Sequence, residues 1–381
     1  MKLGIMLRHL DQHGGGVRGY TEHLLRELFA IGDKHEFVLM YQNPALVGTF
    51  SHVENVREVA VATRSKFLWD QFAVPKIGKE FELDVVFNPK YSLPLRVDCP
   101  AVFVCHGLDW YVMPWGSRWI DRISHRLLVP LYARKASGII AVSETARQHV
   151  LEYLDIDEGR TATVYLGLDD IFRKNLSSER VAKIGETYNL PKRFFLYVGQ
   201  IYPAKNFGRI LRAYARVGPK MGIHLVVAGS PSYLYEKELG LIPELGLDSW
   251  VKQVGWIEHD ELPAFYALAE ALLLPSLYEA CPSPPIEAMA MGCPVLTADR
   301  YGTKEIAQDA ALFVNPEDVD SIANGMKRIV SDDELRKQLI EAGHVRAKDF
   351  HWRDCAAQTL DVLEKVFAGE NINNLESRKA P

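Results

Sequence analysis

Cysteine is scarce in this chain, and the few cysteines present form no recognisable pattern. The 5 residues are odd in number and scattered, and none belongs to a Cys-x-x-Cys pair: Cys99, Cys105, Cys281, Cys293 and Cys355. A disulfide framework normally uses an even set, and a structural zinc site uses closely spaced pairs. The sequence therefore argues against both, and it predicts reduced thiols in a cytoplasmic protein.

Long apolar runs, excess basic charge and low-complexity tracts are also missing. No apolar stretch approaches the roughly 18–20 residues that span a bilayer, and the N-terminus meets Arg8 and His9 too early for a signal peptide. A net charge of −5 gives no general attraction to nucleic acid. What is present is a globular composition, 48% hydrophobic and 24% charged, in 381 residues, which is enough for two domains.

Short β-rich runs alternate with helical patterns along the chain, which predicts two parallel-sheet α/β units. Several runs are uniformly apolar, as strands buried on both faces are. We expect strands near residues 3–7, 36–41, 84–87, 101–105, 138–142 and 163–165 in the first half, and near 194–198, 224–228, 251–254, 271–274 and 294–297 in the second. The polar stretch 169–191 is the predicted linker.

The segment PSLYEACPSPPIE, at Pro275–Glu287, is the most informative part of the chain. Glu279 and Glu287 stand eight apart, and the three prolines between them prevent one continuous helix. We expect a buried strand that ends in a loop carrying Glu279, then a helix capped by Ser283 that contains Glu287 and stops before Gly292. Carboxylates that accept from hydroxyl groups, beside a helix N-terminus that attracts anions, suit a nucleotide-sugar.

This segment and the residues after it, AMAMGCPVLTADRYGTKEIAQDAALFVNPED, resemble the Glu-x7-Glu region of retaining glycosyltransferases of family 4. The resemblance implies the GT-B fold, an α/β architecture of two Rossmann-like parallel-sheet domains facing a cleft. Residues 1–172 would form the acceptor side and residues 173–349 the nucleotide-sugar side. A last helix at about 350–369 would return to the first domain, followed by a polar, frayed tail at 370–381.

A glycine-rich loop within Gly14–Gly19 follows the first predicted strand and matches Gly-x-Gly-x-x-Gly. An NAD site would also need an acidic residue closing the second strand, where this chain has Gln42 and Asn43. The NAD interpretation therefore fails. The family resemblance places Gly15 and Gly16 against the donor diphosphate and the acceptor, while a plain tight turn is the alternative.

His106 follows the apolar stretch 101–105, so it lies at the carboxyl edge of the first sheet, where parallel sheets bind ligands. It resembles the family histidine that faces the donor sugar and the reacting bond. The next residue is Gly107, where the family commonly has Asp. A histidine that only caps a strand end is the alternative.

The second half opens with a strand, Gly199, a loop and Lys205 at a helix start. An ammonium and helix amides that converge there make a phosphate site plausible. The family often carries Arg directly after this glycine, and Gln200 replaces it here. Lys205 is then the obvious cation for the departing phosphate, with a solvated lysine as the alternative.

The resemblance assigns roles to these residues as a set. The catalytic residues would be His106, Lys205 and Glu279. The donor, held between the domains, would contact Gly15, Gly16, Gly199, Gln200, Lys205, Cys281, Ser283 and Glu287, with Glu287 on the ribose. Ala280 and Cys281 depart from the usual glycine and aromatic residue of the family loop. Retention without a carboxylate nucleophile implies front-face attack, in which the leaving phosphate takes the acceptor's proton.

Two Asp-x-Asp triplets could suggest a metal site, as in glycosyltransferases of the other main fold. Asp155–Asp157 falls in a polar loop after a helix, and Asp318–Asp320 opens a helix, where the dipole favours acids. We therefore expect no catalytic metal and no cofactor, the nucleotide-sugar being a substrate.

The expected partners are a nucleotide-sugar, preferably GDP-mannose with UDP-sugars next, and a saccharide or lipid-linked saccharide acceptor, with no nucleic acid. Two alternatives stay open: a non-catalytic GT-B scaffold that binds a glycan or a partner protein, and a sugar-nucleotide epimerase of the same fold. The Glu-x7-Glu segment disfavours the epimerase.

The segment Trp119–Ala136 is basic, and Trp119, Ile123 and Leu127 share one helical stripe. Such a helix can lie on an anionic membrane, here the inner face. It can also pack its stripe into the domain and leave the arginines in water, which is the interpretation we favour. Pro130 is expected to interrupt it in either case.

Overall fold

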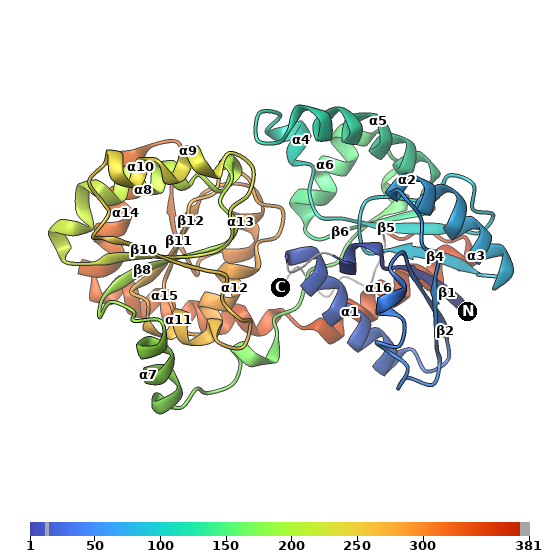
Figure 1. The fold of residues 1–381 in the computed structure, drawn as a ribbon, viewed down its shortest axis with the longest axis horizontal. Helices are drawn as coiled ribbons and strands as arrows, with labels where there is room; N and C mark the ends of the chain where they lie inside the picture. Colours follow the sequence, from blue (N-terminus) through green and yellow to red (C-terminus); the bar gives the residue numbers. More distant parts are fainter. Residues whose placement is uncertain (12–14, 374–381) are drawn as a thin grey trace. The chain divides into compact units, whose positions relative to one another are not determined.

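The computed structural model describes residues 1–11 and 15–373. The chain divides into two compact units (Figure 1). The first takes in Met1–Tyr111, Ile120–Gly167 and residues 351–373, and the second takes in Val112–Trp119 and Leu168–Phe350. Each unit is built around its own parallel sheet.

Within the described residues, the sheet of the first unit has 7 strands in the order β3-β2-β1-β4-β5-β6-β7, all parallel. Apolar side chains buried on both faces hold its centre. The strands are β1 (Lys2–Met6), β2 (Glu36–Tyr41), β3 (Val56–Ala60), β4 (Val85–Asn88), β5 (Ala101–Cys105), β6 (Gly138–Ala141) and β7 (Thr161–Thr163). The order reverses between β1 and β4, and parallel sheets bind ligands at such a switch point.

Helices cover both faces of this sheet. They are α1 (Gly16–Ile31), α2 (Lys66–Leu68), α3 (Val74–Glu80), α4 (Asp109–Val112), α5 (Trp119–Lys135), α6 (Glu144–Leu154) and α16 (Trp352–Ala368), with the short turns η1 (Arg8–Asp11), η3 (Trp69–Ala73) and η4 (Glu158–Arg160). The returning helix is confirmed, because α16 belongs to the first unit and packs along α1 (Figure 1).

The frayed tail was predicted to begin too early. Ile372 is fully buried, and its amide donates to the carbonyl of Gly159 at 2.8 Å. Burial of the Ile372 side chain in the first unit holds residues 370–373 there, although the segment is otherwise polar. The rest of the predicted tail, residues 374–381, lies outside the described residues.

The helix α5 packs into its domain, but not through the predicted stripe. The helix runs through Pro130 without a break, and its apolar stripe faces solvent, with Trp119 64%, Ile123 48% and Leu127 65% exposed. The side chains that pack inward are Val129, Tyr132 and Ala133. Among the described residues, no helix has both the length and the apolar composition needed to cross a bilayer.

In the described chain the second sheet has 6 parallel strands in the order β10-β9-β8-β11-β12-β13, which reverses between β8 and β11. The strands are β8 (Phe194–Val198), β9 (His224–Ala228), β10 (Val251–Gly255), β11 (Ala271–Leu274), β12 (Val295–Ala298) and β13 (Leu312–Val314). The helices are α7 (Ser178–Thr187), α8 (Phe207–Val217), α9 (Tyr235–Leu239), α10 (Leu241–Glu244), α11 (Leu262–Leu268), α12 (Ser283–Ala290), α13 (Tyr301–Ala307), α14 (Val319–Ser331) and α15 (Asp333–Arg346).

The stretch 169–191 is more than a linker. It contains α7, which packs against α11, and the ring of Tyr188 lies edge-on to Phe265 at 5.0 Å. The polar composition comes from the outer face of α7, whose buried residue is Ile184. This stretch therefore belongs to the second unit.

Candidate active site

The switch point of the second sheet brings the predicted donor residues together. Gly199 and Lys205 follow β8, Glu279 follows β11, and these two strands are neighbours. Because the carboxyl ends of parallel strands meet at one edge, residues 74 positions apart in the sequence become partners.

Lys205 and Glu279 form a largely buried ion pair. The Nζ atom lies 2.5 Å from Oε1 of Glu279, and the two side chains are 14% and 10% exposed. Ser276 donates its hydroxyl to the same Oε1 at 2.8 Å. Burial alone would lower the pKa of Lys205, but the adjacent carboxylate of Glu279 raises it to about 12. Lys205 therefore carries its charge at neutral pH.

Gly302, at the start of α13, holds the Glu279 loop in place. Its amide donates to the carbonyl of Glu279 at 3.0 Å. A Cβ at Gly302 would lie 1.9 Å from the carbonyl oxygen of Ala280, so this close approach requires glycine. The rings of Tyr278 and Tyr301 pack edge-on at 5.3 Å beside it.

The helix after the loop begins differently from our prediction. Ser283 is the first helical residue of α12 and does not cap it with its side chain; Pro282 occupies the cap position. Pro284 and Pro285 lack amide hydrogens, so Ser283 supplies the amide of the first turn. Fewer amides are available here for an anion than at an ordinary helix start.

Glu287 is confirmed as a helical residue of α12 and is 9% exposed. Tyr266, on α11, donates its hydroxyl to Oε2 at 2.7 Å. Burial raises the pKa of Glu287, and Tyr266, His259 and Ser283 partly offset that shift. The contacts of Tyr266, Ser276 and Gly302 with the two glutamates were not predicted. Ser276 and Gly302 lie within the family-like segment and Tyr266 lies outside it, and these contacts follow from the folded structure.

Two further predicted donor residues lie at the end of β8. Gly199 has φ of 140°, a conformation that favours glycine. The carbonyl of Gln200 accepts from the hydroxyl of Tyr197 at 2.8 Å, and its side chain is exposed. Cys281 is half-buried beside Ser283 in the neighbouring loop.

In the first unit, His106 follows β5, as predicted. Its Nε2 atom lies 2.8 Å from the carbonyl oxygen of Pro89, which can only accept, so Nε2 carries the hydrogen. Burial lowers the pKa of His106 to about 4, and nearby Lys90 adds to this shift. The ring is therefore neutral at pH 7, and its Nδ1 atom is an acceptor.

Gly15, with φ of 105°, directly precedes α1, which has no side-chain cap. A Cβ at Gly15 or Gly16 would meet nothing within 4 Å. Gly14 lies outside the described residues. The two Asp-x-Asp triplets have structural partners, since Asp157 accepts from the amide of Gly159 at 2.7 Å and Asp318 caps α14.

Comparison with known proteins identifies the chain's family. Residues 182–346 match the sequence model described as glycosyl transferases group 1, and residues 14–171 match that of glycosyltransferase family 4. The chain belongs to glycosyltransferase family 4. This membership supports a transferase over the epimerase and scaffold alternatives.

Curated relatives agree with this assignment. The chain is 23% identical over 371 residues to O-antigen chain mannosyltransferase B of Escherichia coli, covering 92% of this chain and 96% of that one. It is 29% identical over 336 residues to the serotype-specific mannosyltransferase WbdA of Escherichia coli, covering 83% of this chain but 40% of that protein.

Among solved structures, sucrose-phosphate synthase from Thermosynechococcus elongatus aligns with a TM-score of 0.79 at 19% identity, over 97% of this chain and 100% of that one. A glycosyltransferase from Rickettsia africae aligns with a TM-score of 0.75 at 19% identity, over 96% and 98%. The predicted GT-B fold is confirmed.

Proposed function

We propose that this glycosyltransferase transfers mannose from GDP-mannose to a saccharide or lipid-linked saccharide, with retention of configuration and without a metal ion. Relatives over most of the chain are named as mannosyltransferases, one of them for the O-antigen chain. The observation that carries the chemistry is the buried Lys205–Glu279 pair at the switch point of the second sheet.

The two members of the pair bind two parts of the donor, the sugar and the diphosphate. Glu279 accepts from hydroxyl groups of the sugar, while Lys205 stabilises the diphosphate. Negative charge on the diphosphate grows as the glycosidic bond breaks, so the ammonium stabilises the transition state more than the bound substrate. Glu287 accepts from the ribose. With Lys205 and the amide of Ser283 in this role, a divalent ion is not required.

The first unit serves the acceptor. His106 is neutral with its hydrogen fixed on Nε2, so its Nδ1 accepts from a hydroxyl group of the substrate and does not act as a general acid. The leaving phosphate oxygen takes the proton of the attacking acceptor hydroxyl on the same face of the sugar, which retains the configuration.

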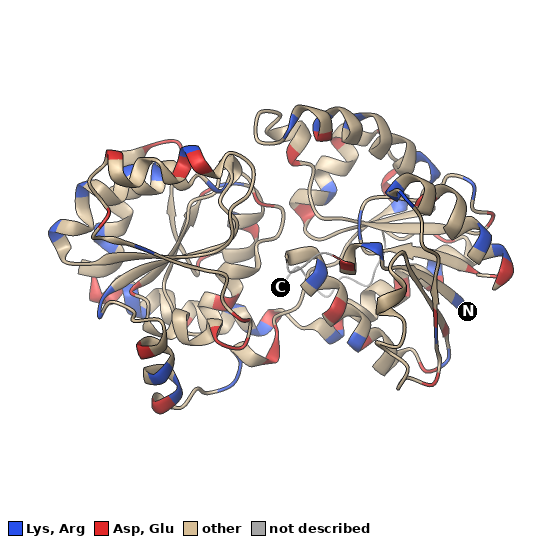
Figure 2. Cartoon of the chain, in the orientation of Figure 1, with Lys and Arg blue, Asp and Glu red and all other residues tan. Residues whose placement is uncertain are grey.

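A lipid-linked acceptor requires contact with a membrane, and α5 has a suitable surface. Trp119, Ile120, Ile123, Leu127 and Leu131 are 64%, 60%, 48%, 65% and 44% exposed. Basic residues are spaced along the same helix, whose one acid is Asp121 (Figure 2). The apolar side chains can insert between the lipids of an anionic bilayer, and the arginines can pair with its head groups. We infer that α5 lies on the membrane surface.

A thermal-shift comparison tests the donor. Only a ligand that binds the folded protein raises its melting temperature, so GDP-mannose should give a larger shift than UDP-glucose, UDP-N-acetylglucosamine or ADP-glucose. A larger shift with a UDP- or ADP-sugar would contradict the proposed nucleotide.

A further inference from the structure

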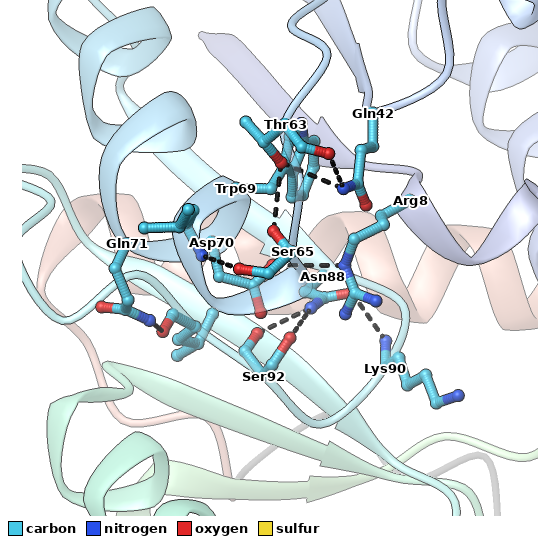
Figure 3. Close-up of polar contacts among 12 residues, drawn as sticks. Arg8, Gln42, Thr63, Ser65, Trp69, Asp70, Gln71, Asn88, Lys90 and Ser92 are labelled. Atoms are coloured by element: carbon cyan, nitrogen blue, oxygen red, sulfur yellow. Dashed lines mark hydrogen bonds and ion pairs between the residues drawn. The ribbon is translucent and has the colours of Figure 1, made fainter.

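Three cationic side chains gather at the switch point of the first sheet. Arg8 follows β1, Lys90 follows β4, and Lys66 begins α2. β1 and β4 are neighbours, so Arg8 and Lys90 extend from the same carboxyl edge. Figure 3 shows Arg8 and Lys90 in the same group of side chains as Asp70 and Asn88. The place corresponds to that of Lys205 and Glu279 in the second sheet.

The charges in this group do not balance. Two carboxylates face it: Asp70, whose Oδ1 lies 3.4 Å from Nε of Arg8, and Asp121 of α5, which acts electrostatically on Lys66. Neither Oδ1 of Asp70 nor Nε of Arg8, both buried, has a hydrogen-bond partner. Within residues 1–11 and 15–373, no carboxylate forms an ion pair with Lys66 or Lys90. The three cations therefore outnumber the two carboxylates that face them.

The excess positive charge disfavours the protonated form of Lys90. Partial burial, together with the positive charges of Lys66 and Arg8, lowers the pKa of Lys90 to about 8. The aromatic face of Tyr91 lies 5.7 Å from the ammonium and offsets little of this. Unpaired, partly buried cations are retained where a ligand compensates them.

Buried amide side chains fix the loops that present these cations. Asn88 donates to the carbonyl of Ser92 at 2.6 Å, and its Oδ1 accepts the amide of Lys90 at 3.0 Å. Gln71, in η3, donates to the carbonyl of Leu93 at 2.9 Å and accepts the amide of Leu95 at 2.8 Å (Figure 3). The loop from residue 88 to 95 is therefore held at both ends, and Lys90 is positioned before any ligand arrives.

We propose that Arg8, Lys66 and Lys90 bind a phosphate or diphosphate group of the acceptor. Guanidinium and ammonium groups are the side chains that pair best with phosphate oxygens. The site lies beside His106, whose Nε2 donates to Pro89, the residue before Lys90. An acceptor anchored there by its phosphate would be held next to His106. This inference rests on the proposed acceptor role of the first unit.

Calorimetric titration of the full chain with inorganic pyrophosphate tests the site. The titration is run at low salt with saturating GDP and, separately, with saturating UDP, so that the donor site is occupied. We expect Lys90→Gln to weaken pyrophosphate binding by about tenfold or more, and Lys66→Gln by roughly threefold. Lys79→Gln, an exposed lysine of α3, should leave the affinity unchanged. Lys90→Gln within about twofold of wild type would overturn the proposal.

Stability gives a second readout. Because Lys90→Gln removes an unpaired cation, it should raise the melting temperature of the ligand-free protein while it lowers the shift caused by pyrophosphate. An unchanged pyrophosphate-induced shift would count against the site.

Two soluble probes distinguish the possible sources of the phosphate. Farnesyl diphosphate binding more tightly than pyrophosphate would indicate a lipid-linked acceptor, and mannose 6-phosphate doing so would indicate a phosphorylated sugar. Whichever probe binds more tightly, its affinity must fall in Lys90→Gln. An unchanged affinity would overturn the proposed site. Since no turnover is involved, failure of GDP-mannose as a donor would leave this test intact.

Discussion

The ammonium of Lys205 and the carboxylate of Glu279 lie 2.5 Å apart in a part of the second unit where little solvent reaches either side chain. Each neutralises the other, so a substitution of one leaves a buried, uncompensated charge on its partner. Loss of activity after a single substitution would therefore mix lost catalysis with lost stability. The two effects separate in a double-mutant cycle.

We predict that Lys205→Met lowers kcat by on the order of 10²–10³, roughly 3–4 kcal/mol, because an interaction that strengthens in the transition state is lost. Glu279→Gln should restore the melting temperature of Lys205→Met but not its kcat. Steady-state kinetics and thermal unfolding of both single variants and the double variant measure the cycle. If the double variant recovered wild-type kcat, Lys205 would serve only to neutralise Glu279.

Gly302→Ala should displace the loop that carries Glu279. The new Cβ would lie 1.9 Å from the carbonyl oxygen of Ala280, so the loop or the start of α13 must move. A displacement of about 1 Å at a catalytic group can cost on the order of a hundredfold in rate. Gly185→Ala, on α7, is the matched control, because its Cβ would meet only a side-chain methyl at 3.4 Å. Wild-type kcat/KM for Gly302→Ala would show that the loop position is not critical.

Acid should destabilise the first unit through two histidines, His9, which is buried, and His106, which is half-buried. Burial lowers the pKa of His9 to about 3 and that of His106 to about 4, from 6.5. Below pH 6.5 the unfolded chain binds protons that the folded chain does not, so stability falls as pH decreases towards 4. The slope is at most about 1.4 kcal/mol per pH unit for each histidine.

His106→Gln keeps a donor for the carbonyl of Pro89 and removes one titrating group, so its melting temperature should fall less steeply between pH 7 and 5. His52→Gln, an exposed histidine of the same unit, should follow the wild type. A His106→Gln profile parallel to the wild-type profile would rule out this source of the acid sensitivity.

The exposed stripe of α5 should bind anionic vesicles. Trp119→Ser combined with Leu127→Ser removes two apolar side chains, each worth roughly 1.5–3 kcal/mol when fully buried, and should weaken binding to phosphatidylglycerol vesicles by at least about tenfold. Trp256→Ser, which alters a tryptophan 58% exposed in the second unit, should bind normally. Co-sedimentation measures the difference, and equal binding of all three proteins would exclude α5 as the membrane contact.

Much of the fold was predictable because most strands are buried on both faces. The runs at β2, β5, β8, β9 and β11 match the predicted residues. β3 was not predicted, because it is an edge strand with Arg57 and Glu58 in its middle. β13 was not predicted either, because it has only three residues. Apolar periodicity found the stripe of α5 but could not show whether that stripe faces the core, since packing depends on neighbours distant in sequence.

The positions of the candidate residues in the fold were predictable one by one, but their arrangement was not. Glu279, Glu287 and Lys205 were found from local patterns, whereas the contact between Lys205 and Glu279 follows from the adjacency of β8 and β11. Strand order is a property of the whole sheet. The imbalance of charge around Lys90 could not be predicted for the same reason, because Arg8 and Lys90 come together through the pairing of β1 with β4.

The most direct test is the configuration of the sugar that the enzyme releases. With water as acceptor and EDTA present, GDP-mannose should be hydrolysed slowly, and time-resolved proton NMR should show that the first mannose formed keeps the donor's anomeric configuration. This follows if Lys205 meets the phosphate charge and the acceptor attacks from the leaving-group side. Turnover that stops with EDTA and returns with Mn²⁺ or Mg²⁺ would contradict the metal-free site, and an inverted product would contradict the proposed mechanism itself.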